Sequence, residues 1–342
     1  MVFDLIKNGL APALFARLPW SVLGTLVKVS PLIPYYHIVS DSDVPHVKHL
    51  YRFRNVDQFK KDIDTFLRSY NLLTLDDLLE ALRRGRSFPR RAFLLTFDDG
   101  FRELYDVVAP VLLQKGLSAT FFITTACLDN IDMAYHNKIS LVLEHLSRMK
   151  KKAPEDELLR ILSERGIQSP DVRTALLRID YRNKDVLQTV ANLLELDFDC
   201  YLTTRKPYLT SEQVRKLIDM GFSIGAHSID HPLYSAISFE EQLHQTRASV
   251  RALRTRFSLN YGAFAFPHGA GDVSARFFSE IFAEGDVDVS FGTAGMLKDV
   301  FPRHFERFSM EYTSAPAERI IGRHYARGLF KRVIGRQVTQ RT

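Results

Sequence analysis

The segment AFLLTFDDGF, residues 92–101, ends an apolar run with two adjacent carboxylates, Asp98 and Asp99. The apolar residues before Asp98 predict a buried strand. Neighbouring carboxylates repel each other, and each is costly to bury unpaired. A divalent cation that binds one of them and lowers the pKa of the other resolves this conflict. A turn or helix N-cap is the structural alternative, and the doublet alone leaves both interpretations open.

Apolar runs alternate with amphipathic helical patterns along most of the chain. Strands separated by helices pair in parallel through right-handed crossovers, and solidly apolar strands are typical of sheets covered on both faces. The sequence therefore predicts an α/β fold, a barrel of parallel strands ringed by helices. The expected strands are 33–39, 92–97, 119–123, 222–226, 262–266 and 287–291, and the expected helices lie near 56–69, 74–84, 104–115, 211–220, 239–257 and 273–284.

Residues 129–207 interrupt this alternation with charged helical patterns. They predict a helical insertion between one barrel strand and the next barrel helix. We expect the barrel domain over 33–312. An N-terminal helical segment at 1–32, packed on the barrel or on a membrane surface, precedes it. A basic helical tail at 313–342 follows it.

The composition is ordinary for a soluble globular protein: 342 residues, 46% hydrophobic and 25% charged, with a net charge of +6. The positive excess lies largely at the C-terminus. That tail could contact an anionic membrane surface, although a solvated helix is the simpler interpretation. Two cysteines imply no disulfide framework. The start of the chain lacks the features of a signal peptide, which favours a cytoplasmic location, with peripheral membrane contact as an addition. No nucleic-acid partner is expected.

A second cluster of chemistry-bearing residues, FSIGAHSIDHPLYS at 222–235, follows another apolar strand. His227 and His231 can bind one metal ion if the chain between them curls like a helical turn, which Ser228 and Pro232 would shape. In parallel α/β barrels, active sites form where the carboxyl ends of the strands meet. Two histidines and one aspartate leave open coordination positions, as a catalytic metal requires.

The third motif, FAFPHGAGD at 264–272, turns the chain after a strand. Its Pro267-His268-Gly269 turn can point the backbone N–H of His268 at a developing oxyanion. Taken alone, such a sequence is more often only a turn.

In this order, TFDDG, HSIDHP and FAFPHG resemble the motifs of polysaccharide deacetylases, carbohydrate esterase family 4, which includes peptidoglycan and chitin deacetylases. GLSATFFITT and LTSEQVRKLIDMGFSIGAHSIDHP are similar to that family along their whole length. The resemblance covers about residues 33–128 and 207–312, with the helical insertion between them.

The resemblance implies a distorted (β/α) barrel and a divalent metal, with Zn²⁺ as the expected ion, held by Asp99, His227 and His231. It implies that Asp98 is the general base and that the His268 N–H stabilises the oxyanion, within the Pro267 turn. The implied activity is metal-dependent hydrolysis of an N-acetyl group on a sugar of a polysaccharide or glycan precursor, with release of acetate.

One departure from the family concerns the partner of the catalytic aspartate. Many members carry an Arg in the third motif, where this sequence has Ala265 and Phe266. A related subgroup places an Arg late in the fold. Arg307 is therefore the expected partner of Asp98, and Arg303 is the alternative.

The other departure concerns the proton donor to the leaving amine. The family's late Leu-x-His supplies it, but the corresponding RFSMEYT holds no histidine. His304, His268 and His37 are the candidates, and the sequence does not choose among them.

Two alternatives stay beside the deacetylase interpretation. The missing Leu-x-His motivates a non-catalytic glycan-binding or assembly protein on a deacetylase scaffold. The same hydrolysis on a small amide or ester is the other, because loops and the insertion decide substrate choice.

Overall fold

The computed structural model describes residues 27, 29–150, 153–311, 313–336 and 338–341. Its central feature is an eight-stranded sheet, nearly closed into a barrel, in which neighbouring strands are parallel. The α/β barrel predicted from the sequence is thus confirmed. In spatial order the strands are β10 (His304–Glu306), β8 (Val289–Gly292), β7 (Ala263–Ala265), β6 (Ser223–Ala226), β5 (Thr120–Ile123), β4 (Thr96–Phe97), β1 (Pro34–Tyr36) and β11 (Phe308–Ser309).

The two edge strands, β10 and β11, are consecutive in the chain with only Arg307 between them. β10 pairs with β8 and β11 pairs with β1, so one run of chain bridges both edges of the sheet. The Arg307 N–H donates to Gly292 O at 3.2 Å, and the Phe308 N–H donates to Ile33 O at 3.0 Å. These two strands are not predicted from the sequence, because their charged and polar residues hide the apolar pattern of a buried strand.

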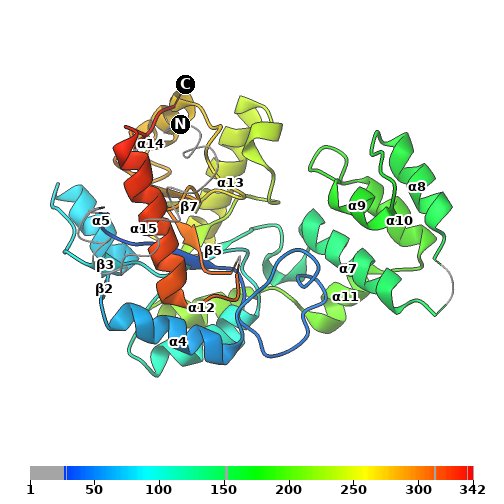
Figure 1. Cartoon of the computed structure of the whole chain (residues 1–342), viewed down its shortest axis with the longest axis horizontal. Helices are drawn as coiled ribbons and strands as arrows, with labels where there is room; N and C mark the ends of the chain where they lie inside the picture. The colour runs from blue at the N-terminus through cyan, green and yellow to red at the C-terminus, as the bar shows by residue number, and fades with distance from the viewer. Residues whose placement is uncertain (1–26, 28, 151–152, 312, 337, 342) are drawn as a thin grey trace, which may run out of the picture.

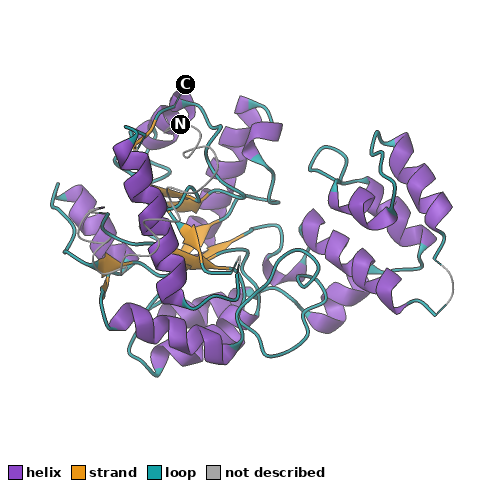
Figure 2. Ribbon diagram, viewed as in Figure 1, coloured by secondary structure: helices purple, strands orange, loops and turns teal. Residues whose placement is uncertain are grey.

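Helices surround the barrel (Figures 1 and 2). Several of these helices begin at a residue whose side chain caps the first turn. Asn55, Thr74 and Thr210 each form a capping box at such a start. Strands and helices expected from the sequence match to within a few residues, although the strand expected at 92–97 is split in two. The helices are α4 (Val56–Leu67), α5 (Leu75–Arg83), η1 (Leu104–Val108), α6 (Ala109–Leu113), α12 (Ser211–Asp219), α13 (Phe239–Phe257) and α14 (Ala275–Ala283). Two short pairs, β2 (Asn71–Leu72) with β3 (Ala92–Phe93) and β9 (Lys298–Asp299) with β12 (Val338–Thr339), lie outside the barrel sheet.

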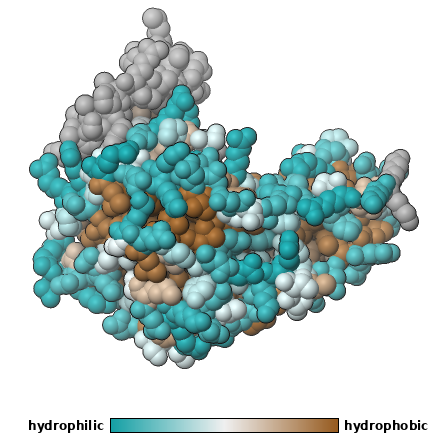
Figure 3. Space-filling model, turned by 90° about the horizontal axis from the view of Figure 1, so that it is seen from below, coloured by the Kyte–Doolittle hydropathy of each residue, from teal (hydrophilic) through white to brown (hydrophobic). Residues whose placement is uncertain are grey.

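The segment between β5 and α12 forms a separate helical lobe, seen at the right of Figure 1. Its helices are α7 (Tyr135–Arg148), α8 (Glu155–Glu164), α9 (Val172–Leu177), α10 (Val186–Leu193) and α11 (Phe198–Arg205). Their apolar faces share one core, and its described residues include no strand. The space-filling view also shows this lobe beside the barrel (Figure 3). In that view the barrel exposes an apolar area on the face turned to the viewer. Cys127 and Cys200 are both free.

The structure describes most of the C-terminal tail but little of the N-terminal segment. Residues 1–26, most of the expected N-terminal helical segment, lie outside the described residues. The expected basic tail contains α15 (Ala317–Val333), which packs against α4 and is half-buried rather than freely solvated. Its exposed side carries Arg319, Arg323 and Arg327, so the membrane contact expected for this region stays a prediction. Within the described residues, no helix has the length and apolar character needed to cross a bilayer.

The end of the chain is held to the barrel by a buried ion pair. Arg341 donates to Asp299 Oδ2 from Nε at 2.9 Å and lies 2.7 Å from it through Nη2, and both side chains are fully buried. Arg341 also donates to the Val273 carbonyl at 3.1 Å. Beside this pair, β12 adds to β9. The last part of the chain is therefore an integral part of the fold.

We predict that Arg341→Met lowers the free energy of unfolding by about 3 kcal/mol, because it leaves the Asp299 carboxylate buried without its counter-charge. Chemical denaturation monitored by circular dichroism measures the change. Arg336→Met, which removes an exposed arginine of the same segment, is the matched control and should change stability little. Equal stability of the two variants would contradict the structural role of Arg341.

Candidate active site

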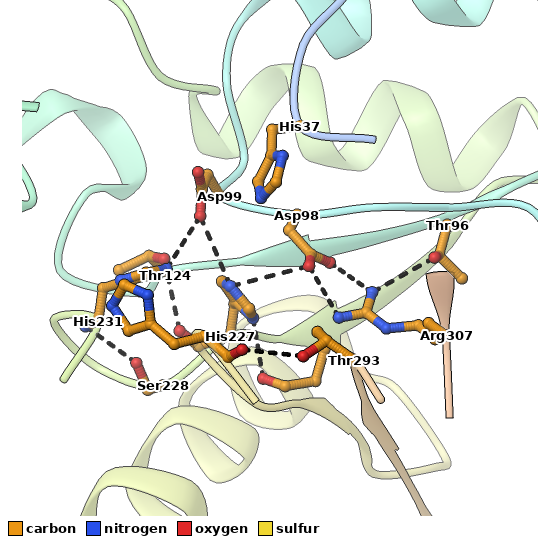
Figure 4. Close-up of polar contacts among 12 residues, drawn as sticks. His37, Thr96, Asp98, Asp99, Thr124, His227, Ser228, His231, Thr293 and Arg307 are labelled. Carbon is orange, nitrogen blue, oxygen red and sulfur yellow. Dashed lines mark hydrogen bonds and ion pairs between the residues drawn. The ribbon is translucent and has the colours of Figure 1, made fainter. Parts of the chain in front are cut away.

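Asp98 and Asp99 follow β4 and point to different partners (Figure 4). Successive residues of a regular strand face opposite sides of the sheet, so two strand neighbours could not both line one cavity. Asp99 breaks this alternation with a φ of +71°, and Gly100 follows with +74°. A left-handed conformation is unfavourable for a residue other than glycine and is typical of functional turns. This turn brings both carboxylates to the same cavity.

Arg307 holds Asp98 through two parallel hydrogen bonds. Its Nη1 donates to Oδ1 at 2.6 Å and its Nη2 to Oδ2 at 2.8 Å, with Asp98 only 2% exposed and Arg307 fully buried. Nε donates to the Gly292 carbonyl and Nη1 also to Thr96 Oγ1, while the guanidinium lies over the Tyr35 ring. Burial acts to raise the pKa of Asp98, but the charge and hydrogen bonds of Arg307, together with the nearby His227 and His37, outweigh it and hold that pKa below its ordinary value. Asp98 is therefore ionised and fixed in direction.

Asp99 faces two imidazoles from the loop after β6. Its Oδ1 lies 3.5 Å from His227 Nε2 and 3.4 Å from His231 Nε2. The loop that carries them is irregular rather than the helical turn expected from the spacing, since Ser228 and His231 both have a positive φ. Ser228 shapes it as expected, because its hydroxyl oxygen accepts from the His231 N–H at 2.9 Å.

The ring of His227 is oriented by a hydrogen bond from the nitrogen that faces away from Asp99. Its Nδ1 lies 2.8 Å from the Ala265 carbonyl, an acceptor only, so Nδ1 carries the proton and the lone pair of Nε2 is available to a cation beside Asp99. Burial is the largest influence on this ring and lowers the pKa of His227 to about 4, despite the opposing charge of Asp98. A neutral imidazole whose remote nitrogen donates to a carbonyl is the usual form of a metal-binding histidine.

Asp99, His227 and His231 fit a metal ion. The three ligand atoms lie within 4.8 Å of one another, and all three residues are buried. Tetrahedral Zn²⁺ with bonds of about 2.0–2.1 Å places its ligand atoms roughly 3.3–3.4 Å apart, close to both measured separations. Asp99 Oδ1 is buried and has no hydrogen-bond partner among the described residues. A buried carboxylate oxygen without a hydrogen-bond donor is rare, and a cation held between these three ligand atoms would satisfy it.

A second group of potential ligands, Asp299, His304 and Glu306, lies elsewhere in the barrel. The Arg341 guanidinium already supplies a positive charge there, 2.7 Å from Asp299 and 3.9 Å from Glu306. Because the charge of Arg341 already balances these carboxylates, this group has less need of a metal ion than the first group.

The two aspartates and two histidines line a cavity of about 300 Å³. His37, at the end of β1, lies on the same cavity with its Nδ1 2.5 Å from Glu311 Oε2. Glu311 also accepts from the backbone N–H groups of His37 and Ile38. Burial acts to lower the pKa of His37, but the Glu311 charge and hydrogen bond outweigh it and raise this pKa to about 9. His37 is therefore a cation at neutral pH.

Of the remaining predicted residues, some line the cavity and others do not. His268 lines the cavity with a φ of +58°, and its carbonyl accepts from Thr293 Oγ1 at 2.8 Å. Pro267 is buried, and its carbonyl accepts from the Gly269 N–H. His304 is not among the residues that line the cavity: it is buried between Ser290 and Glu306. That position argues against His304 as proton donor.

Arg303, the alternative partner for Asp98, points away from the site. Its Nη2 donates to the Phe282 carbonyl, and its guanidinium lies over the Phe282 ring. Arg307 alone of the two arginines contacts Asp98.

Several residues on the cavity were missed by the sequence analysis: Glu311, Tyr51, His136 and Leu177. Glu311 lies in the stretch RFSMEYT, which corresponds to the family's Leu-x-His, and its pairing with His37 spans 274 residues. His136 and Leu177 belong to the insertion, and no motif marks either of them.

Comparison with known proteins gives a family and a fold. The family model described as "Polysaccharide deacetylase" matches residues 85–280, more than half of the chain. No curated protein sequence matched. Solved structures that are similar include the Streptococcus pyogenes deacetylase PplD in complex with acetate, at 15% identity and a TM-score of 0.53, covering 84% of this chain and 95% of that one. IcaB from Ammonifex degensii is similar at 14% identity and 0.52, covering 86% and 96%. A de-N-acetylase from Aggregatibacter actinomycetemcomitans is similar at 13% and 0.54, covering 85% and 98%.

We predict that the purified chain binds Zn²⁺ through Asp99, His227 and His231, and that His231→Ala weakens this binding at least about tenfold because one of three ligands is lost. Competition with a chromophoric chelator measures the affinity. His304→Gln, which alters the second group, is the matched control and should bind Zn²⁺ as the unaltered chain does. Loss of binding in His304→Gln together with retention in His231→Ala would place the ion elsewhere.

Proposed function

Because this chain belongs to the polysaccharide deacetylase family, a family of hydrolases that cleave the carbon–nitrogen bond of N-acetyl groups, we propose that it removes acetyl groups from an N-acetylated sugar of a polysaccharide or glycan precursor in a metal-dependent reaction. One observation carries this proposal. A buried, arginine-held carboxylate, Asp98, lies on the same cavity as the group Asp99, His227 and His231, whose spacing fits a metal ion.

Asp99, His227 and His231 would hold the metal, and their mixture of nitrogen and oxygen ligands favours Zn²⁺. When bound, such an ion acts as a Lewis acid and lowers the pKa of a water ligand to about 7. Three protein ligands would leave coordination positions of the ion open for water and substrate.

Asp98 serves as the general base. It is ionised, and the two hydrogen bonds from Arg307 fix its direction. Asp98 takes a proton from the attacking water as the water oxygen bonds to the acetamide carbonyl carbon. Such a positioned base contributes on the order of 10²–10⁴ in rate.

The backbone N–H of His268 stabilises the carbonyl oxygen as it gains negative charge. None of the hydrogen bonds among the described residues uses this N–H. It belongs to a residue on the cavity wall, and the positive φ of His268 sets its direction. A single oxyanion donor of this kind is worth about 3 kcal/mol of the barrier.

His37 gives the proton to the leaving amine, so that the carbon–nitrogen bond breaks to acetate and a free amine. Its pKa of about 9 keeps it protonated at neutral pH. Desolvation and the nearby His231 and His227 lower the pKa of His268, although its side chain is exposed. The Glu311 carboxylate orients the His37 imidazole and raises its pKa. His37, which follows β1, offers the proton donor whose absence from the Leu-x-His position motivated the non-catalytic alternative.

We predict that the Zn²⁺-loaded protein releases acetate from an N-acetylglucosamine oligomer and that Asp98→Asn lowers kcat about a thousandfold, since an amide cannot take the proton. Enzymatic detection of acetate measures the rate. Asp98→Asn should keep its Zn²⁺ affinity, which separates loss of the base from loss of the metal. Full activity in Asp98→Asn, or release only from small amides or esters, would contradict the proposal.

We predict that Glu311→Gln moves the alkaline limb of kcat/KM to lower pH by at least about one unit. The acid must be protonated to act, so activity is present below the His37 pKa and lost above it. Without the Glu311 charge, the effect of burial prevails and that pKa falls.

The pH dependence of acetate release measures this shift. Glu144→Gln is the matched control, because Glu144 pairs with His49 at 2.8 Å and neither residue is among those that line the cavity. An alkaline limb that stays unchanged in Glu311→Gln would exclude His37 as the proton donor.

A further inference from the structure

The helical insertion reaches into the cavity of the active site. His136, in the first turn of α7, and Leu177, the last residue of α9, line the same cavity as Asp98 and Asp99. Leu177 is 45% exposed, so its apolar side chain is accessible to a molecule bound in the cavity. Two separate helices of the insertion therefore contribute to one wall of the cavity.

The insertion is fastened to the loop that carries His231. Tyr181 donates from its hydroxyl to Asp230, the residue before His231, at 2.8 Å, and Lys184 forms an ion pair with the same carboxylate. Gln245 of α13 donates to the other oxygen of Asp230 at 2.8 Å. These contacts join the insertion, the loop and a barrel helix at the carboxylate of Asp230. They fix the position of the insertion relative to the cavity.

His136 lies beside the candidate metal ligands without being one of them. Its ring centroid is 4.4 Å from that of His231 and 6.3 Å from that of His268, and it is not in the group of three ligand atoms. Its Nδ1 is buried and has no hydrogen-bond partner among the described residues. A buried polar atom without a partner is costly, and a polar group bound in the cavity would supply that partner.

We propose that the insertion selects the substrate, with His136 as the residue that recognises it. His136 forms a hydrogen bond with a hydroxyl group of the sugar that carries the acetamido group, and Leu177 packs against the C–H face of a sugar ring. A sugar offers both chemistries, hydroxyls at its edge and apolar C–H bonds on its faces. This assignment rests on the proposed deacetylase function and extends it to the recognition of the glycan.

The first test is His136→Ala assayed with the Zn²⁺-loaded protein and an N-acetylglucosamine oligomer. We expect KM to rise about fivefold with kcat nearly unchanged, which is the loss of one neutral hydrogen bond made equally in the ground and transition states. His136→Gln, whose amide can still form hydrogen bonds, should recover part of the affinity. His145→Ala removes the other histidine of α7, which is not among the cavity residues, and should leave KM unchanged.

A second measurement does not depend on turnover. Calorimetric binding of the oligomer to Asp98→Asn and to the double variant with His136→Ala should show the same fivefold weakening. Unchanged binding and KM in His136→Ala would overturn the proposal. A fall in Zn²⁺ affinity of His136→Ala would overturn it as well, since it would make His136 a metal ligand. Failure of the unaltered chain to release acetate, with the binding difference preserved, would instead count against the proposed function alone.

Discussion

The buried ion pair between Asp98 and Arg307 joins the chemistry of the site to the closure of the barrel. Arg307 is the single residue between β10 and β11, the two edges of the sheet, and its backbone bonds to the neighbouring strand at Gly292. A guanidinium with no exposure to water is tolerated only when its hydrogen bonds are satisfied. Asp98, Thr96 and the Gly292 carbonyl satisfy them. Arg307, at the point where the two edges of the sheet meet, therefore provides a charge that keeps Asp98 ionised.

The other carboxylates of the cavity are balanced separately from this pair. Two adjacent carboxylates share a buried site because a left-handed turn at Asp99 directs one to Arg307 and the other to the imidazoles. A third carboxylate, Glu311, lies on the same cavity and is matched by His37. Each negative charge thus has its own positive partner or, at Asp99, a set of ligand atoms spaced for a cation. This division lets one cavity hold a carboxylate whose pKa is lowered, Asp98, and an imidazole whose pKa is raised, His37.

Much of the fold could be predicted from local pattern. Apolar runs and amphipathic helices marked the strands and helices, and the change of pattern at 129–207 marked the insertion. The strand at 304–309 could not be found in this way, because His304, Glu306 and Arg307 are buried through polar contacts rather than by apolar character. For the site, Asp98, Asp99, His227 and His231 lay in recognisable motifs. Glu311, His136 and Leu177 did not, since their importance comes only from the residues that they face across the cavity.

The sequence by itself determined the α/β barrel, the helical insertion and the order of the three motifs, because these depend on periodicity and on residues close together in the chain. Only the tertiary structure decided which arginine holds Asp98, which histidine is charged and which part of the insertion reaches the cavity. The physical reason is that a pairing such as His37 with Glu311, or Arg307 with Asp98, joins residues more than 200 positions apart. Burial then sets the charge of each group, and burial is a property of the folded chain rather than of any segment of it.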